Sequence, residues 1–253
     1  MATAILDGVV ANGLFSSERI IVSNPHVDKL EYPKALGVKV TCDNRDVAAT
    51  ADIIILAVKP QKYEEVLNEI GDYCAGKCLV SIAAGLSVDW ICKRLPGAFI
   101  VRVMPNTPLQ LGLGATAVAQ APNVPTELFR IVCDIFSAAG TVSVIPESQM
   151  DDVIPVSGSS PAFFFRMADV MVKWAAEHGM TPEIALKLAA VTMKGAAELL
   201  LRSGKSPEEL IRQVCSPGGT TLAALTAFDD RDFDGLLNDA MTRCAKRSRE
   251  LGK

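Results

Sequence analysis

The most constraining feature of this sequence is a change of pattern near residue 147. Before it, short apolar runs rich in β-branched residues alternate with helical patterns, which is typical of a parallel sheet with crossover helices. After it, strand patterns stop and only helical patterns follow. We therefore expect an α/β domain over residues 1–147 and an all-helical domain over residues 148–253.

The alternation predicts the individual elements. Strands are expected at 19–24, 38–41, 52–58, 78–84, 99–104, 115–119 and 142–145. Helices are expected between them at 28–36, 45–51, 62–73, 88–94 and 126–139, and in the second domain at 162–178, 182–202, 207–214, 221–227 and 233–251. The first set predicts a doubly wound parallel sheet of the Rossmann-like, dinucleotide-binding kind.

The first residues of the chain depart from that pattern. Dinucleotide-binding domains open with a strand and a G-x-G-x-x-G loop, whereas this sequence begins directly with an amphipathic helical pattern. The absent strand is central in the usual sheet order. Either the sequence is truncated or the protein has lost its pyrophosphate cradle, and truncation is the favoured interpretation because the remaining pattern is intact. In that case the chain as written is expected to be nearly inactive.

Composition excludes several classes of function. The 253 residues include 49% hydrophobic residues and carry a net charge of −4 without a basic cluster, which argues against nucleic acid or an anionic membrane as partner. No apolar run reaches the roughly 18–20 residues that span a bilayer, and no signal peptide is visible. Seven scattered cysteines fit a reducing compartment, so a cytoplasmic location is expected.

The sequence offers few residues for a metal site or for a hydrolase active site. Cys74 and Cys78 lie close together in sequence, but neither a histidine nor a second cysteine pair accompanies them with zinc-site spacing, so no metal site is expected. The only histidines are His26 and His178, and no G-x-S-x-G motif is present.

One uncharged turn stands out in the helical half. The sequence Ser216-Pro217-Gly218-Gly219-Thr220-Thr221 precedes an apolar helical pattern and contains no ionisable side chain. Backbone N–H groups at such a helix N-terminus can hold a carboxylate or phosphate without a cation. An ordinary helix cap after a tight turn gives the same sequence, so the turn alone leaves both interpretations open.

Four further segments occur in an order that, with this turn, resembles the pyrroline-5-carboxylate reductase family. They are Ala57-Val58-Lys59-Pro60, Ser81-Ile82-Ala83-Ala84-Gly85, Val101-Arg102-Val103-Met104-Pro105-Asn106-Thr107-Pro108 and Ser157-Gly158-Ser159-Ser160-Pro161. The resemblance covers nearly the whole chain. It implies reduction of 1-pyrroline-5-carboxylate to L-proline, the last step of proline biosynthesis, with NADP as cofactor and NAD as the alternative.

The resemblance also implies the residues that bind the cofactor. They are Met1, Ala2, Ser23, Asn24, Asn44, Ala57, Val58, Lys59, Pro60, Ala83, Ala84, Asn106, Thr107 and Gln213. Neither Ser23 nor Asn24 offers a carboxylate to a ribose 2′-hydroxyl, which favours NADP over NAD. A solvated lysine that opens a helix is the alternative for Lys59, but its position at the carboxyl end of a strand, where ligands collect in such sheets, favours the cofactor role.

By the same resemblance, the substrate is bound by Ser157, Gly219, Thr220 and Thr221. The N–H groups of the turn would hold the substrate carboxylate, with the catalytic Thr221 hydroxyl near the ring nitrogen. Cys215 stands where Thr or Ser is usual, as either an inert or a reactive thiol. Because a cyclic imine can arrive already protonated, the enzyme needs geometry and a fixed anchor more than a strong general acid.

Two other interpretations remain open. A β-hydroxyacid dehydrogenase shares the two-domain plan but uses a K-x-x-N motif, which the helical half lacks. A non-catalytic or regulatory helical dimer would account for the absent first strand. Whichever interpretation holds, the apolar residues of helix 182–202 are more numerous than a single buried face needs. This predicts a dimer of interlocked helices or a larger homo-oligomer.

Overall fold

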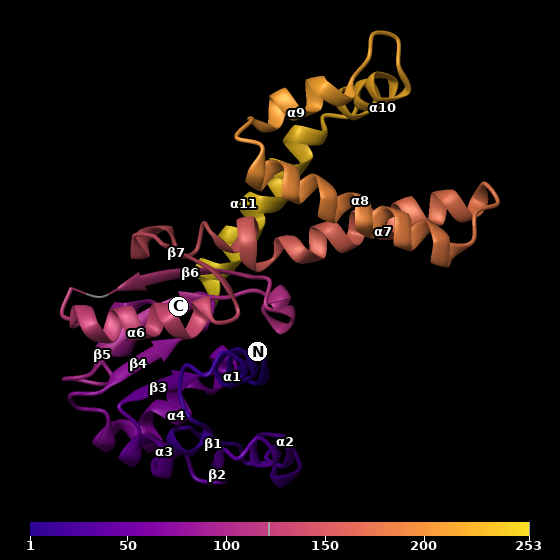
Figure 1. Ribbon diagram of the computed structural model, residues 1–253. Helices are drawn as coiled ribbons and strands as arrows, with labels where there is room; N and C mark the ends of the chain where they lie inside the picture. Colours follow the sequence, from indigo (N-terminus) through magenta and orange to yellow (C-terminus); the bar gives the residue numbers. More distant parts are fainter. Residues whose placement is uncertain (121, 253) are drawn as a thin grey trace. The chain divides into compact units, whose positions relative to one another are not determined.

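The computed structural model of the protein describes residues 1–120 and 122–252. The chain divides into two compact units, which we call the α/β unit (Met1–Pro161 and Arg243–Lys253) and the helical unit (Ala162–Thr242). Figure 1 shows the elements of both. The predicted domain boundary at residue 147 stays a prediction.

Strands and helices alternate in the α/β unit, as the sequence predicts. The strands are β1 (Ile21–Ser23), β2 (Lys39–Thr41), β3 (Ile53–Leu56), β4 (Cys78–Ser81), β5 (Phe99–Met104), β6 (Gly114–Gln120) and β7 (Gly140–Val144). The helices are α1 (Ala2–Ala11), α2 (Glu31–Ala35), α3 (Asn44–Thr50), α4 (Tyr63–Ile70), α5 (Val88–Cys92) and α6 (Thr126–Ser137). Shorter helical turns are η1 (Ser17–Arg19), η2 (Val27–Lys29), η3 (Pro60–Lys62), η4 (Gly71–Tyr73), η5 (Thr107–Leu111), η6 (Glu147–Gln149) and the π-helical η7 (Ile154–Gly158).

The strands form two sheets. β3-β4-β5-β6-β7 make one, with all neighbours parallel except β5 and β6, and β1-β2 make a parallel pair of their own. The expectation of parallel strands was therefore wrong at β6. Only residues 105–113 connect β5 to β6, which is too short for the crossover of about a dozen residues that a parallel neighbour requires.

The edges of β1 and β3 carry unpaired backbone groups. Asn24 N donates to Thr41 O, so the backbone groups of Ile21 and Ser23 point away from β2. Cys78 N donates to Asp52 O, which by the same alternation turns the groups of Ile53 and Ile55 away from β4. In the described part of the chain no strand lies between these two edges, as expected for a Rossmann-like sheet that lacks its first, central strand.

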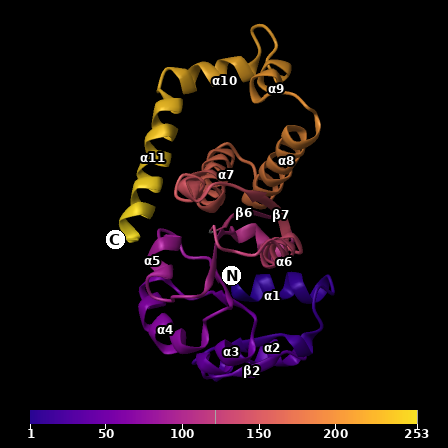
Figure 2. The ribbon, with the colours of Figure 1, turned by 90° about the vertical axis from the view of Figure 1, so that its left-hand side faces the viewer.

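Helices cover both faces of the larger sheet. α1 and α6 lie on one face and α4 and α5 on the other (Figure 2). α1 packs closely against the residues that follow α6: a Cβ added to Gly8 would lie 2.7 Å from the Cβ of Ala139. The core between the layers is apolar and close to fully buried; its largest side chains include Tyr63, Phe136, Leu67, Leu79, Ile91 and Ile100.

The helical unit has almost no core of its own. Its helices are the main part of α7 (Ser160–Glu177), α8 (Pro182–Arg202), α9 (Pro207–Val214), α10 (Thr220–Asp229) and the first part of α11 (Phe233–Leu251). Within residues 162–242, all of which are described, Ala185 is the only buried residue. None of the described helices is long and apolar enough to cross a membrane.

Candidate active site

Three of the predicted cofactor segments meet at one edge of the larger sheet. Leu56, Ser81 and Arg102 are aligned across β3, β4 and β5, and these three strands run parallel. The residues that follow each strand therefore emerge at the same edge, where ligands bind in open α/β sheets. They are Ala57 to Pro60 after β3, Ala83 and Ala84 after β4, and Asn106 and Thr107 after β5.

A buried polar chain joins two of these strand ends. Tyr63, at the start of α4, donates its hydroxyl to Leu56 O over 2.8 Å and accepts from Ser81 Oγ over 3.1 Å. Ser81 Oγ in turn accepts from Ala83 N over 3.5 Å. Burial raises the pKa of Tyr63 to about 12, although its contacts with Ser81 and nearby backbone groups lower it. The Tyr63 hydroxyl thus stays protonated and fixes the strand ends relative to each other.

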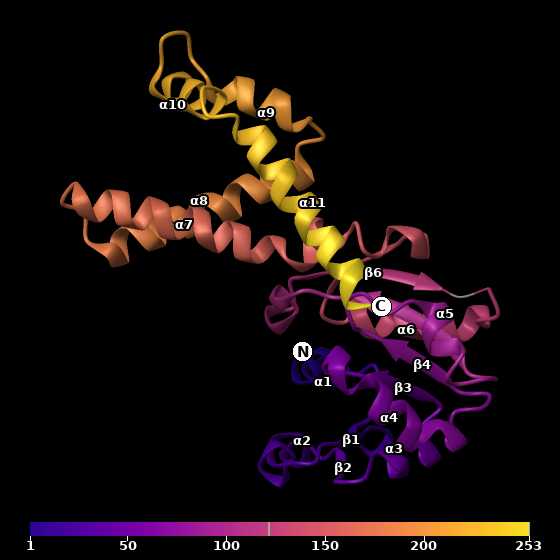
Figure 3. The same ribbon diagram turned by 180° about the vertical axis from the view of Figure 1, so that it is seen from behind.

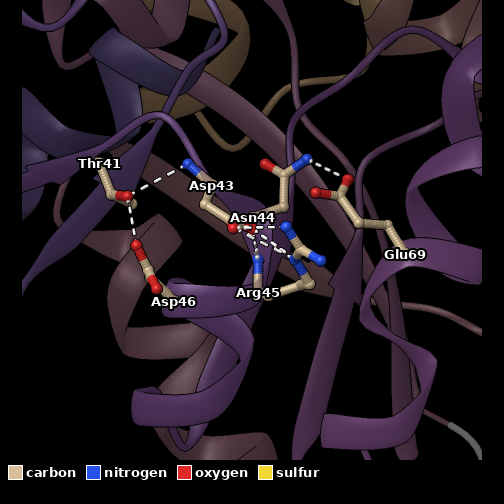
Figure 4. Close-up of polar contacts among 6 residues, drawn as sticks. All are labelled: Thr41, Asp43, Asn44, Arg45, Asp46 and Glu69. Carbon is tan, nitrogen blue, oxygen red and sulfur yellow. Dashed lines mark hydrogen bonds and ion pairs between the residues drawn. The ribbon is translucent and has the colours of Figure 1, made fainter.

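Ser23 and Asn44 lie together where β1 and β2 end. The hydroxyl of Ser23 donates to Asn44 Oδ1 over 2.8 Å. Asn44 Nδ2 donates to Glu69 Oε2 over 2.7 Å (Figure 4). Asn24 accepts from His26 N through Oδ1 over 3.0 Å. The structure therefore brings Ser23 and Asn44 into contact, with Glu69 as a partner that the sequence did not indicate.

The acidic groups beside this cluster are engaged elsewhere. Asp43 caps α3 by accepting from Arg45 N over 2.9 Å and pairs with the Arg45 guanidinium over 2.7 Å (Figure 4). These contacts lower the pKa of Asp43. Asp46 accepts from the Thr41 hydroxyl over 2.6 Å. Both aspartates are therefore engaged by neighbouring groups.

Asn106 connects the β5 end to the turn at η7. Its Nδ2 donates to Ser157 O over 3.0 Å and its Oδ1 accepts from Ala115 N over 3.0 Å. Only 7% of Asn106 is exposed. A predicted cofactor residue and a predicted substrate residue are therefore in direct contact, and the Asn106 side chain holds both segments in place.

The helical unit contains the uncharged turn. Gly218 has a φ of +71°, a left-handed conformation that glycine adopts readily, and Gly219 is the N-cap of α10 without a side-chain cap. The first N–H groups of α10, including those of Thr220 and Thr221, therefore have no acceptor within the helix. Thr221 is half-buried and Thr220 is exposed. This geometry suits a carboxylate.

The remaining predicted residues are less enclosed. Met1 is 40% exposed at the uncapped N-terminus of α1, where it borders a hollow of about 360 Å³ that Gln110 also lines. Lys59 and Thr107 are exposed at the sheet edge, and Gln213 is exposed in α9. A larger hollow, of about 670 Å³, contains none of the predicted residues; it is lined by Val27, Leu30, Glu31, Lys34, Ala35, Val40, Thr41 and Cys42.

No signal in the sequence pointed to Tyr63 or Glu69. In the sequence, Tyr63 looks like an ordinary apolar position of an amphipathic helix, and Glu69 looks like a surface carboxylate outside the motifs. Among residues 1–120 and 122–252, no group of three metal-binding side chains lies close enough to hold an ion.

Comparison with known proteins covers both units. Residues 147–251 match the family described as pyrroline-5-carboxylate reductase dimerisation, and residues 1–85 match one described as NADP oxidoreductase, coenzyme F420-dependent. Pyrroline-5-carboxylate reductase of Synechocystis sp. is 37% identical over 254 residues, covering 100% of this chain and 95% of that protein. The enzyme of Escherichia coli is 37% identical over 256 residues, with the same coverage.

Solved structures of pyrroline-5-carboxylate reductases have the same fold as this chain. The pyrroline-5-carboxylate reductase of Coxiella burnetii superposes with a TM-score of 0.91 at 35% identity, covering 100% of this chain and 95% of that one. The Plasmodium falciparum enzyme, solved with NADP bound, gives 0.91 at 27% identity, covering 99% and 94%.

The fold and its sheet edge define a two-domain, dinucleotide-dependent oxidoreductase with a helical dimerisation domain. Within that class, the chain belongs to the pyrroline-5-carboxylate reductase family. The predicted family, fold class, enzyme class and NAD(P) dependence are thereby confirmed. The individual site residues stay predictions.

Proposed function

We propose that this protein reduces 1-pyrroline-5-carboxylate to L-proline with NADPH, as the last step of proline biosynthesis in the cytoplasm. The observation that carries this proposal is the uncapped N-terminus of α10 behind Gly218 and Gly219, in a chain that matches reductases of this name over their length. Such a terminus binds a carboxylate, and the substrate is a small carboxylate.

The residues at the sheet edge fit a dinucleotide. Ala83 and Ala84 are small and leave room for a ribose, and Ser23 and Asn24 offer hydroxyl and amide groups rather than a carboxylate to a 2′-phosphate. The fit of these residues supports NADP, with NAD as the alternative. The cofactor supplies hydride to the imine carbon when bound.

The chain's own groups act by binding and orientation. The α10 N–H groups would hold the substrate carboxylate, and the Thr221 hydroxyl would contact the ring nitrogen. Ser157, whose carbonyl accepts from Asn106, is the further predicted substrate residue. Because the imine nitrogen can already carry its proton, this pocket needs no histidine or carboxylic acid as a proton donor.

The exposure of the helical unit supports a dimer as the active form. A folded unit with Ala185 as its only buried residue cannot be stable alone, since burial of apolar surface is the main favourable contribution to folding. Large apolar side chains are exposed along α7 and α8, among them Phe165, Trp174, Leu188, Val191, Leu199 and Leu201. We propose that a second copy of the chain covers them through interlocked helices. The cysteines form no disulfide in the described part of the chain, consistent with a reducing compartment.

The test is a direct assay, with pyrroline-5-carboxylate and NADPH, of the protein extended by the first strand and glycine loop of a relative; NADPH oxidation and L-proline formation are both measured. Equal amounts of each are expected. Oligomeric protein that binds NADPH but forms no proline would favour a different substrate. Protein that binds no dinucleotide at all would favour the non-catalytic helical dimer.

A further inference from the structure

Arg102 is a buried cation at the centre of a network that reaches beyond the proposed site. It lies near the end of β5 and is 2% exposed. Its Nη2 donates to Asp151 Oδ1 over 2.8 Å, and Nη1 lies 3.8 Å from Glu147 Oε1. A buried guanidinium needs such carboxylates, because an uncompensated charge in the interior is strongly destabilising. The segment from Glu147 to Asp151 therefore has a fixed position against β5.

The same two carboxylates hold two other parts of the α/β unit. Glu147 Oε1 accepts from Val88 N, at the start of α5, over 2.7 Å. Asp151 Oδ1 accepts from the hydroxyl of Ser248, in the last turn of α11, over 2.7 Å. Ser248 is itself only 4% exposed. The end of α11 is thus docked on the network through a buried hydrogen bond.

The end of α11 also lies directly against the loop that follows β4. Gly85 has a φ of +82°, and an added Cβ there would lie 2.9 Å from Gly252 N and closer still to Ser248 O. A Cβ added to Gly252 would overlap the carbonyl oxygen of Gly85. Both glycines are therefore required by a backbone-to-backbone contact. The end of α11 lies beside α5 in the views of Figures 2 and 3.

Loop 83–87 is consequently restrained on two sides. The Glu147 carboxylate binds the N–H of Val88, the residue that follows the loop, and the end of α11 covers Gly85. This loop begins with Ala83 and Ala84, which the proposed function assigns to the dinucleotide.

We propose that Ser248 and Gly252 are positioning residues for dinucleotide binding: they hold loop 83–87 in the conformation that accepts the cofactor. This inference rests on the proposed function for the role of Ala83 and Ala84. Because α11 is one continuous helix whose first part belongs to the helical unit, the restraint links the cofactor loop to the unit that carries the predicted substrate turn.

The test combines amide hydrogen exchange of the segment 83–87 with the Kd for NADPH, in the 253-residue protein. Ser248→Ala removes the hydrogen bond to Asp151 but leaves the Arg102–Asp151 pair, and Gly252→Ala disturbs the contact with Gly85. Each variant should speed exchange of this segment and raise the Kd by roughly fivefold to tenfold, with exchange of β4 unchanged. A merely structural role would speed exchange throughout the α/β unit and leave the Kd unchanged.

Matched controls are available for both variants. Arg247→Ala removes an exposed ion pair whose partner, Glu250, is on the same helix. Gly71→Ala adds a Cβ in η4 whose nearest neighbour is Leu95 Cδ2 at 3.5 Å, an ordinary van der Waals contact. Both should behave as the parent protein does.

The outcomes separate the inference from the proposed function. If NADPH protects segment 83–87 in the parent but Ser248→Ala and Gly252→Ala change neither exchange nor Kd, the positioning role is wrong. Faster exchange at an unchanged Kd also overturns it. If NADPH neither binds the parent nor protects this segment, the cofactor assignment itself fails.

Discussion

The side-chain amide of Asn106 donates to the backbone carbonyl of Ser157 over 3.0 Å, and so joins the end of β5 to the turn that opens the helical half of the sequence. The same side chain accepts from Ala115 N. Asn106→Ala leaves the carbonyl of Ser157 and the N–H of Ala115, both in part-buried contacts, without this partner and should lower the free energy of unfolding by about 1–3 kcal/mol, measured by urea denaturation. Thr107→Ala, at the exposed neighbour, should change it by less than about 0.5 kcal/mol. Equal stability of the two variants would remove Asn106 from this structural role.

Tyr63 makes stability depend on pH in the alkaline range. Its folded-state pKa, about 12, lies above the ordinary value of 10.0, so its contribution is complete below pH 10 and is lost as pH rises to about 12. A shift of this size corresponds to about 2–3 kcal/mol. Tyr63→Phe should therefore flatten this part of the profile of unfolding free energy against pH. A profile that falls equally steeply in the variant would show that other groups, such as the buried thiol of Cys78, cause it.

The contacts of Asn106 and Tyr63 were not predicted from the sequence, although the strands that they join were. Strand positions followed from apolar runs, so each of the seven expected strands is found in the described residues, within a few residues of its predicted ends. Strand direction and buried polar contacts did not follow. An apolar run reports burial but not direction, and only the short connection between β5 and β6 could have indicated the antiparallel pair.

The sequence motifs predicted which segments form the candidate site, but they did not predict the residues that hold those segments in place. Ser23 and Asn44 were both expected to contact the cofactor, and the structure shows that they bind each other. Tyr63, Glu147 and Ser248 carry no motif, and they act through contacts between residues far apart in the sequence. Such contacts depend on the completed fold.

The proposed substrate anchor predicts a specific kinetic effect of Thr221→Val. This change keeps the shape but removes the hydroxyl, which should cost about 1–3 kcal/mol, or roughly 5- to 150-fold in kcat/KM for the imine. The Kd for NADPH should barely change. Thr226→Val is a suitable control, since the Thr226 hydroxyl binds only Leu222 O within the same helix. An unaltered kcat/KM in Thr221→Val would exclude this side chain from the site.

The exposed apolar surface of the helical unit predicts that assembly and activity are lost together. Leu199 is 55% exposed in α8. Leu199→Glu places a charge where a second copy is expected, and light scattering should show a lower mass together with lower activity. Lys194→Glu introduces the same carboxylate at a polar position of α8 and should keep the oligomer. An active monomer of Leu199→Glu would contradict the proposal that the dimer is the active form.

The unpaired edges of β1 and β3 predict that an added parallel strand is stabilising. A form of the protein extended by the first strand and glycine loop of a relative should unfold at a higher urea concentration than the 253-residue chain and bind NADPH more tightly. Urea denaturation and fluorescence titration measure the two effects. Identical midpoints and affinities would mean that the strand does not enter between these edges.

The most direct test of the proposed function is L-proline formation from pyrroline-5-carboxylate and NADPH, measured in parallel for the 253-residue protein, its extended form and Thr221→Val of that form. We expect proline in amounts equal to the NADPH oxidised, with the highest rate in the extended form and a lower rate in Thr221→Val. If the extended form is folded, oligomeric and saturated with NADPH yet makes no proline, the proposed function is contradicted.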